Sequence, residues 1–285
     1  MQRIDAHQHF WQYDPTRDSW ITEDMEKIRR DFLPEDLAPL LKENGVAGCI
    51  AVQADQSLAE TDFLLQLAAR YDFIKGVVGW VDLKSPQLNT TVDHYNTNSG
   101  SFLKGFRHIL QGEADLNGFL ADGLFEKGLR YILSKGYTYD LLVYHDQLPA
   151  LQPLVESLSS DGAIKDCKLV LDHMGKPDLK SGEIKNWQQQ IRRLASHKNV
   201  YCKISGMVTE ADWHHWKPDD LRAALDTVLD AFGPERLMFG SDWPVCLVAS
   251  TYDRWLEVLT QYFQPLSREQ QSAIFGGNCA RFYGI

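Results

Sequence analysis

The sequence predicts an α/β protein folded as a single (β/α)8 TIM barrel. Eight short apolar runs that resemble strands alternate with segments of helical periodicity, and several runs end at a histidine or an aspartate. Barrels of this kind run to about 250 residues or somewhat more, and this chain has 285. No linker-like change in composition divides it, so residues 1–285 are expected to form one domain.

The expected strands are short and apolar, as is usual for strands of a parallel sheet that are buried on both faces. They lie within residues 3–10, 46–54, 74–81, 102–106, 139–144, 167–171, 200–204 and 237–239.

The expected helices show apolar residues at helical spacing. Pro34 suits a first helical position, Ser57 with Glu60 forms a capping-box pattern, and Gly45 and Gly136 follow helix ends. The helices cover residues 34–43, 57–70, 88–95, 124–134, 148–158, 184–195, 221–232, 252–263 and 268–275. Residues 10–33 form a long loop with room for a short helix, and residues 96–101 and 111–117 form connections.

An open doubly wound sheet would show the same alternation of strands and helices. No glycine-rich phosphate loop follows any of the expected strands, so the main functional reason to prefer the open sheet is missing. The barrel is therefore the favoured architecture.

Composition and charge narrow the class of partner. The formal net charge of −10 argues against a nucleic acid or an anionic membrane as the main partner. The five cysteines are scattered without C-x-x-C spacing, which favours free buried thiols. Arg3 and Asp5 fall where a signal peptide would be apolar, and no apolar run approaches the roughly 20 residues of a membrane helix. We expect a cytoplasmic protein.

Two histidines at the end of the first strand give the first indication of a site. Successive strand residues point to opposite faces, so His7 and His9 project to the same side. Active sites of (β/α)8 barrels lie at the carboxyl ends of the strands. Randomly placed histidines would seldom gather there, yet these ends hold His7, His9, Arg107, His108, His145, His173 and Asp242.

Five segments together resemble the amidohydrolase superfamily. Within it they are most similar to the lactone-hydrolysing branch, which includes sugar lactonases and pyrone-dicarboxylate hydrolase. The segments span nearly the whole chain and comprise residues 4–11 (IDAHQHFW), 105–108 (GFRH), 171–177 (LDHMGKP), 203–206 (KISG) and 239–244 (FGSDWP).

Asp242 is the first candidate for a catalytic residue. A carboxylate at the end of the last strand can take a proton from water and return it to the leaving oxygen, although it could also cap the following turn. The resemblance implies the same role for this aspartate. His173, His7 and His9 are the other catalytic candidates, able to bind a substrate carbonyl or a metal.

Several further residues are candidates for substrate binding. Arg107 offers a planar fork of donors, and Trp11, Trp20 and Trp243 could pack flat faces against a sugar. The alternative for Arg107 is a salt bridge at the rim, and for the tryptophans it is the anchoring of loops. His145 could instead bond to a loop, and Lys203 could be paired inside the barrel. The adjacent pair His214 and His215 is interpreted as part of a loop after the seventh strand.

The metal requirement stays open at this point. His7, His9, His173 and Asp242 could hold one divalent ion such as zinc, with His145 as a further candidate. Many relatives bridge two metals with a carboxylated lysine after the fourth strand, where this chain has Arg107 and His108, so two metals are not expected. The lactonase branch that the chain resembles also includes members that need no metal. A metal-independent or weakly metal-bound enzyme is therefore slightly favoured.

The function implied is hydrolysis of a sugar-acid lactone such as fuconolactone, galactonolactone or rhamnonolactone. The expected partner is the small-molecule lactone, and homo-oligomer formation is left open. The alternatives are a hydrolase or decarboxylase of a planar aromatic-derived acid or pyrone, a mononuclear zinc hydrolase, and a ligand-binding barrel without catalysis. The last would predict loss of the aspartate or of several histidines, all of which this chain keeps.

Overall fold

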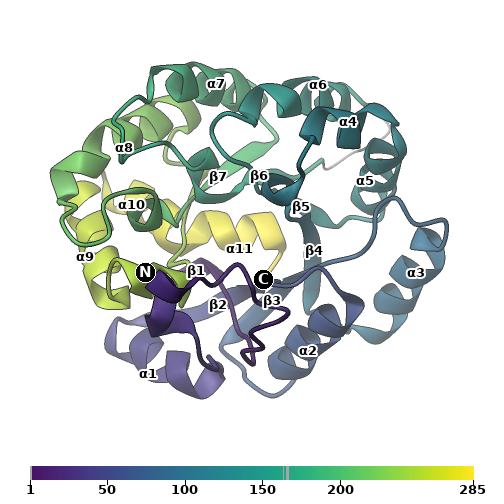
Figure 1. Ribbon diagram of the computed structural model, residues 1–285, viewed down its shortest axis with the longest axis horizontal. Helices are drawn as coiled ribbons and strands as arrows, with labels where there is room; N and C mark the ends of the chain where they lie inside the picture. The colour runs from purple at the N-terminus through teal and green to yellow at the C-terminus, as the bar shows by residue number, and fades with distance from the viewer. Residues whose placement is uncertain (1, 163, 165–166) are drawn as a thin grey trace.

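The eight strands form one parallel sheet that is rolled into a barrel, which confirms the predicted fold class. The computed structural model describes residues 2–162, 164 and 167–285. Each strand pairs with the next one in sequence, in the order β1 to β8, and helices surround the sheet (Figure 1). The strands are β1 (Arg3–Gln8), β2 (Val46–Val52), β3 (Ile74–Gly79), β4 (Leu103–His108), β5 (Thr138–Leu141), β6 (Leu169–Leu171), β7 (Val200–Ile204) and β8 (Leu237–Phe239).

The helices pack their apolar sides on the outer face of the barrel. Buried side chains from most of them join one large apolar cluster with outward-facing strand residues. The α-helices are α1 (Pro34–Glu43), α2 (Leu58–Ala68), α3 (Leu88–Asn98), α4 (Leu116–Ala121), α5 (Leu124–Ser134), α6 (Leu148–Ser159), α7 (Lys185–Ala195), α8 (Pro218–Phe232), α9 (Tyr252–Tyr262), α10 (Arg268–Ser272) and α11 (Asn278–Tyr283). Among the described residues, no helix is both long and apolar enough to cross a membrane.

Backbone contacts between the first strand and the segment after the last strand close the barrel. The amide of His9 donates to the carbonyl of Trp243 at 2.7 Å, and the amide of Asp242 donates to the carbonyl of His7 at 2.8 Å. The buried Asp5 carboxylate accepts from the amide of Ser241 at 2.9 Å. This seam brings the two ends of the sheet, and their polar side chains, into direct contact.

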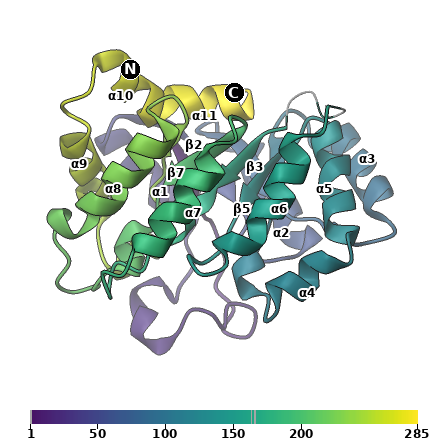
Figure 2. The same ribbon diagram turned by 90° about the horizontal axis from the view of Figure 1, so that it is seen from above.

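The amino-terminal end of the barrel is filled by the last helix. Phe282 and Tyr283 of α11 belong to a second apolar cluster with inward-facing strand residues such as Ile50, Val78 and Met238. Figure 2 shows α11 and both chain ends on one side of the molecule, with the segment that follows β1 on the opposite side. The open end of the barrel is therefore the carboxyl end of the strands.

Some predicted element boundaries were wrong. β5 stops at Leu141, because the carbonyl of Leu142 accepts from the amide of Gln111 in the 3-10 helix Leu110–Gly112 instead of from a neighbouring strand. The predicted loop 111–117 contains the start of α4, because the Asp115 carboxylate caps it through the amide of Gly118 at 3.0 Å. Further differences include the start of α8 at Pro218, the extension of α3 to Asn98 and the additional helix α11.

The cap of α2 was only partly predicted. The Ser57 hydroxyl accepts from the amide of Glu60 at 3.1 Å, as expected for an N-cap. The Glu60 carboxylate, however, accepts from the amide of Ala54 at 3.1 Å instead of turning back to Ser57. Glu60 is 6% exposed, and burial raises its pKa to about 7, with Asp55 and Asp18 nearby adding to the rise.

Replacement of Glu60 by glutamine should stabilise the protein at alkaline pH. An unfolded glutamate ionises above about pH 4.5, whereas the folded one resists ionisation up to about pH 7, so the folded state loses stability as pH rises between those values. At pH 8 we expect Glu60→Gln to raise the free energy of unfolding by about 1–3 kcal/mol, because glutamine keeps the acceptor for Ala54.

The check is urea unfolding at pH 5 and pH 8. The stabilisation should shrink toward zero at pH 5, and Glu156→Gln, at an exposed position of α6, should show none at either pH. An equal effect of Glu60→Gln at both values would contradict the assigned cause.

Candidate active site

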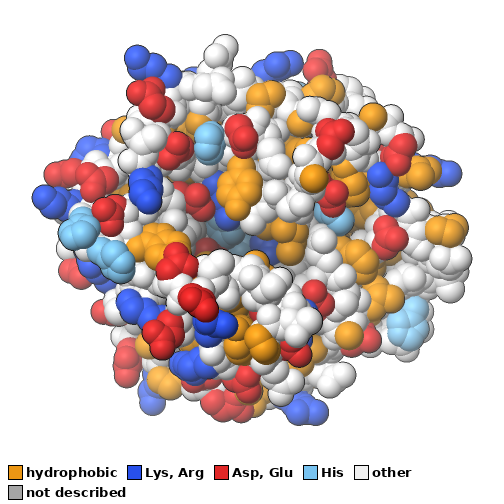
Figure 3. All heavy atoms as spheres, viewed as in Figure 1, with side chains coloured by type: hydrophobic (Ala, Val, Ile, Leu, Met, Phe, Trp, Pro, Cys, Tyr) orange, Lys and Arg blue, Asp and Glu red, His pale blue; other side chains and the backbone are white. Residues whose placement is uncertain are grey.

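Four of the predicted catalytic side chains converge at the carboxyl end of the barrel. His7 lies in β1, His9 follows it, His173 lies in the turn Asp172–Gly175 after β6, and Asp242 follows β8. Each is at most 5% exposed. Figure 3 views this face and shows it hollowed near the centre, with histidine atoms at the base of the hollow.

One carboxylate oxygen of Asp242 is the common neighbour of the three imidazoles. Its Oδ1 lies 3.3 Å from His9 Nε2, 3.8 Å from His7 Nε2 and 3.9 Å from His173 Nε2. The Nε2 atoms of His7 and His9 are themselves 3.2 Å apart. The side chains thus surround one small volume with ring nitrogens and a carboxylate oxygen.

Contacts with neighbouring groups orient two of the rings. His9 Nδ1 lies 2.8 Å from the carbonyl of Val52, which can only accept, so Nδ1 donates. His7 Nε2 lies 3.3 Å from Arg107 Nη1, which can only donate. His7 Nδ1 lies 3.2 Å from both Asp172 Oδ1 and Lys203 Nζ, so each nitrogen of this ring has a cationic donor as a neighbour.

Burial and neighbouring charges set the protonation states. Burial lowers the pKa of His7 well below its ordinary value despite the nearby Asp172, and it does the same for His173 despite Asp242. Burial opposes ionisation of Asp242, yet His173 and His9 hold its pKa below the ordinary value. At neutral pH the site therefore presents neutral His7 and His173 beside an ionised carboxylate.

The backbone around two of these residues is left-handed. His173 and Asp242 have φ values of 51° and 57°, a region that non-glycine residues seldom adopt. The indole of Trp187 donates to the carbonyl of Met174 at 2.7 Å and holds the first of these turns. Strained backbone of this kind clusters at functional sites, where the surrounding structure maintains it.

A buried network of charges lies behind His7. Arg107 Nη1 donates to Asp172 Oδ2 at 3.0 Å, and Lys203 Nζ lies 3.1 Å from Asp172 Oδ1. Lys203 also donates to Asp140, whose carboxylate accepts from the hydroxyl of Tyr283 at 3.1 Å. Asp140 and Asp172 were not among the predicted site residues, although a charged residue inside or directly after an apolar strand was an available signal.

This network shows what surrounds two of the residues predicted to bind substrate. Lys203 is fully buried and paired inside the barrel, which was the alternative considered for it. Arg107 is 3% exposed, and its fork contacts His7, Asp172 and the carbonyl of Gln53. Both cations therefore contact protein groups behind the histidines.

The three predicted tryptophans differ in their surroundings. Trp11 and Trp243 are 2% and 1% exposed and both pack edge-to-face on Phe32, so they anchor the loop instead of offering a free face. Trp20 is 42% exposed and touches Trp11 with its ring edge. Only Trp20 of the three presents a large exposed aromatic surface.

Two charged residues at the rim were missed. Lys176 Nζ lies 3.5 Å from Glu210 Oε1, and both side chains are largely buried. Lys176 is close enough to help hold the pKa of Asp242 down, and half-buried His145 is within electrostatic range of Glu210. The position of Lys176 three residues after His173 was the only sequence signal for it.

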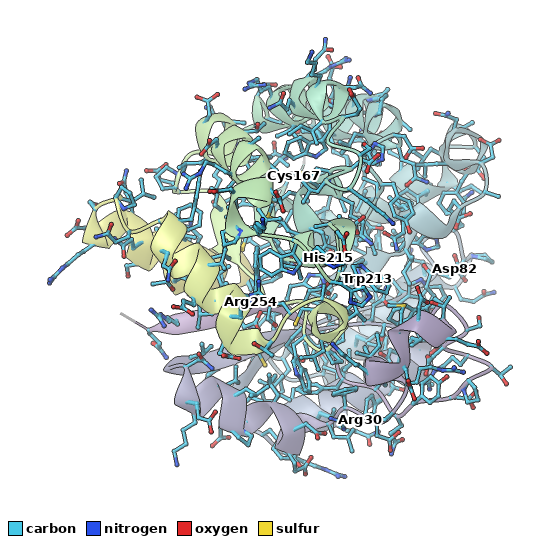
Figure 4. The ribbon with its side chains drawn as sticks, turned by 60° about the vertical axis from the view of Figure 1, so that its left-hand side comes forward. Arg30, Asp82, Cys167, Trp213, His215 and Arg254 are labelled. Atoms are coloured by element: carbon cyan, nitrogen blue, oxygen red, sulfur yellow. The ribbon has the colours of Figure 1, made fainter. Side chains whose placement is uncertain are left out.

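The remaining histidines at or near strand ends lie apart from the four central side chains. His108 Nε2 contacts Glu113 Oε1 at 2.8 Å, on the opposite side of β4 from Arg107. His215 is exposed and pairs with Asp212 at 3.3 Å. Figure 4 shows His215 and Trp213 together on the loop after β7, as predicted for this segment.

One of the groups that could hold a metal ion contains three of the four predicted ligands and omits His9. In it, His7, His173 and Asp242 each offer a ligand atom within 4.8 Å of the others, and so do His7, Asp140 and Asp172 in a second group. His9 Nε2 lies 3.2 Å from His7 Nε2, beside the first group. In the second group, the ammonium of Lys203 already lies among the three side chains.

The fold and this site define an amidohydrolase-type barrel, and comparison with known families agrees. Residues 4–285 match the amidohydrolase family, and the chain belongs to it. A protein of Burkholderia multivorans named L-fucono-1,5-lactonase is 43% identical, over 99% of this chain and 96% of that protein. A protein of the same name from Burkholderia ambifaria is 37% identical over the same shares of the two chains.

A solved structure gives the same picture of the fold. The crystal structure of an amidohydrolase from Burkholderia multivorans with bound zinc has a TM-score of 0.93 and 43% identity, over the whole length of both chains. The family and these relatives identify the chain as a hydrolase.

Replacement of Gly206 by alanine should impair catalysis. Gly206 follows β7 with a φ of 65°, and an added Cβ would lie 2.6 Å from His173 Nδ1 and 3.1 Å from Asp242 Oδ2. Displacement of catalytic groups by about 1 Å can cost roughly 100-fold in rate. We expect a loss of about that size in kcat, measured by steady-state kinetics.

Gly45→Ala is the matched control, because Gly45 has a similar left-handed φ of 62° and an added Cβ there meets open space. If Gly206→Ala kept kcat within threefold of wild type, the close packing of His173 and Asp242 against this glycine would not matter for turnover.

Proposed function

We propose that the protein hydrolyses a sugar-acid lactone to the open hydroxy acid, with an L-fucono-1,5-lactone-like compound as the first substrate to test. The observation that carries the proposal is the ionised Asp242 carboxylate, which faces three buried imidazoles at 3.3–3.9 Å. The names of the full-length relatives support the same substrate class.

Asp242 is the proposed general base. Its depressed pKa keeps it ionised at neutral pH, so it can take a proton from the water that attacks the lactone carbonyl. The tetrahedral intermediate then collapses by breaking the ring C–O bond, and Asp242 returns the proton to the leaving alkoxide. A single carboxylate can therefore serve both steps.

The histidines have a different proposed role from direct hydrogen bonding to the carbonyl. Arg107 already lies 3.3 Å from the Nε2 atom of His7, and the Nε2 atoms of His7 and His9 lie 3.2 Å apart. His7, His173 and Asp242 would hold one divalent cation, with His9 as a further proposed ligand. Such an ion, when bound, would lower the pKa of water and polarise the carbonyl.

Substrate recognition is proposed for the rim. Trp20 offers an exposed aromatic face that suits the C–H surface of a sugar. His145 and the Lys176–Glu210 pair supply donors and acceptors for hydroxyl groups. Arg107 acts from behind by holding His7 and Asp172 in place.

We also propose that the protein acts in the cytoplasm. All five cysteines are buried and free, as is common where thiols stay reduced. The proposed partner is the lactone itself.

The test is turnover of a panel of sugar-acid lactones by the purified protein, followed with a pH indicator because ring opening releases a proton. The panel comprises fucono-, galactono- and rhamnonolactones, which differ in the hydroxyl at C6, in the configuration of ring carbons and in ring size. We expect turnover of a stereochemical subset that includes L-fucono-1,5-lactone. Absence of turnover on every lactone would contradict the proposal.

Chelator treatment in the same assay tests the proposed cation. Loss of turnover with a chelator, and recovery on addition of zinc, is expected if the four side chains hold a metal. Chelator-resistant turnover at the wild-type rate would show that the site works without one.

A further inference from the structure

A cavity at the amino-terminal end of the barrel, away from the catalytic side chains, is lined by three lysines. It lies beside α11 and the ends of α3 and α5, on the side of the molecule where Figure 2 shows α11. Its volume is about 320 Å³, at the lower end of the roughly 300–1,000 Å³ of pockets that hold small ligands. The lysines are Lys104, Lys135 and Lys168.

The strand register places two of these lysines at the amino ends of nearby strands. Lys104 is the second residue of β4, and the next residue, Gly105, pairs with Thr138 of β5. Lys168 comes immediately before β6, and its carbonyl accepts from the amide of Tyr139 of β5 at 3.1 Å. Since only β5 separates the two lysines and neighbouring strands lie roughly 4.8 Å apart, both ammonium groups can reach a single bound group.

The positive charges of this cavity are poorly neutralised by the protein. Lys104 Nζ donates to the backbone carbonyl of Gly284 at 3.1 Å, and burial lowers the pKa of this lysine. Lys135 Nζ lies 3.6 Å from Asp93 Oδ1, but both of these side chains are well exposed. In the described part of the chain, Lys168 forms no ion pair and no aspartate or glutamate lines the cavity. The cavity is therefore a local site of positive charge in a chain whose formal net charge is −10.

A phosphate group matches this set of cations better than a carboxylate does. A phosphate monoester carries a charge of about −1.5 to −2 at neutral pH and three strong acceptor oxygens, whereas a carboxylate carries a single charge. Lysine binds phosphate as a point charge, so long side chains from three different elements can converge on one phosphate without a fixed mutual orientation.

The rest of the cavity can accommodate the molecule to which such a phosphate is attached. The aromatic rings of Tyr137 and Phe282 line it. The Tyr137 hydroxyl donates to Asn96 Oδ1 at 2.9 Å, which leaves the amide nitrogen of Asn96 as a donor for a ligand. The hydroxyl of Tyr283 is already used, because it donates to Asp140 inside the barrel at 3.1 Å. A small polar molecule would thus meet aromatic rings and an amide donor beside the lysines.

We propose that the cavity lined by Lys104, Lys135 and Lys168 is an anion site that binds a phosphate group, either free or carried by a small molecule. Catalysis in (β/α)8 barrels takes place at the carboxyl ends of the strands, whereas this site lies at their amino ends. It is therefore a binding site separate from the catalytic one, and it does not depend on the proposed lactonase function.

Isothermal titration calorimetry of the full chain tests the proposal, with inorganic phosphate and glucose 6-phosphate as probes and glucose as the uncharged control. Sodium chloride holds the ionic strength constant, because salt screens exposed charges. We expect a Kd below about 1 mM for at least one of the two phosphates and no binding of glucose. Tighter binding of glucose 6-phosphate would identify a phosphate monoester as the ligand, and tighter binding of the inorganic ion would identify free phosphate.

Lys168→Met is the decisive variant, because it removes one charge, nearly keeps the side-chain length and breaks no ion pair of the described residues. Loss of a hydrogen bond to a charged group weakens binding by roughly 10- to 100-fold. We expect a loss of that size in the affinity for the tighter-binding phosphate, with an unchanged melting temperature. Lys168→Arg keeps the charge and should bind within threefold of wild type.

Lys104→Met should weaken phosphate binding by a similar factor. Lys75→Met is its matched control, because Lys75 is also a half-buried strand lysine whose ammonium donates to a backbone carbonyl, that of Asp72, at 2.6 Å. Lys75 does not line the cavity, so its replacement should leave phosphate affinity unchanged.

Two results would overturn the proposal. One is the absence of binding of both phosphates to wild type up to about 10 mM. The other is a Kd within twofold of wild type in both Lys104→Met and Lys168→Met, because the phosphate would then bind elsewhere on the protein.

Discussion

The site depends on the seam where the barrel closes. The amide of Asp242 donates to the carbonyl of His7, and the amide of His9 donates to the carbonyl of Trp243. The Asp5 carboxylate strengthens the seam by accepting from the amides of His7 and Ser241 and from the hydroxyl of Tyr252. Residues at opposite ends of the chain thereby become neighbours, and the base and two histidines are placed by backbone hydrogen bonds.

Behind the seam, buried ion pairs set the chemical state of the histidines. Arg107 and Lys203 neutralise Asp140 and Asp172 in the barrel interior. Because these opposite charges are equal in number, burial keeps the imidazole of His7 neutral. The carbonyl of Val52 lies 2.8 Å from Nδ1 of His9 and orients that ring. The orientation of both rings toward Asp242 is therefore a consequence of contacts on the other side of each ring.

The fold and the four central residues could be predicted because both follow from periodicity. Alternating strands and helices indicate a barrel, and a barrel brings strand ends such as those before His173 and Asp242 together. The direction of long side chains could not be predicted in this way. Whether Lys203 points to substrate or pairs with Asp140, and whether Trp243 faces the hollow or Phe32, depends on three-dimensional packing. The early end of β5 is also set by a contact from outside the strand, the hydrogen bond from the amide of Gln111 to the carbonyl of Leu142.

The most direct test of the account is kcat of Asp242→Asn on the lactone that wild type turns over. Asparagine keeps the size and the backbone bond to His7 but cannot take a proton from water at neutral pH. General-base catalysis contributes roughly 100- to 10,000-fold, so we predict a fall in kcat of about 1,000-fold with the fold and melting temperature nearly unchanged. A kcat within tenfold of wild type would contradict the assignment of Asp242 as the base.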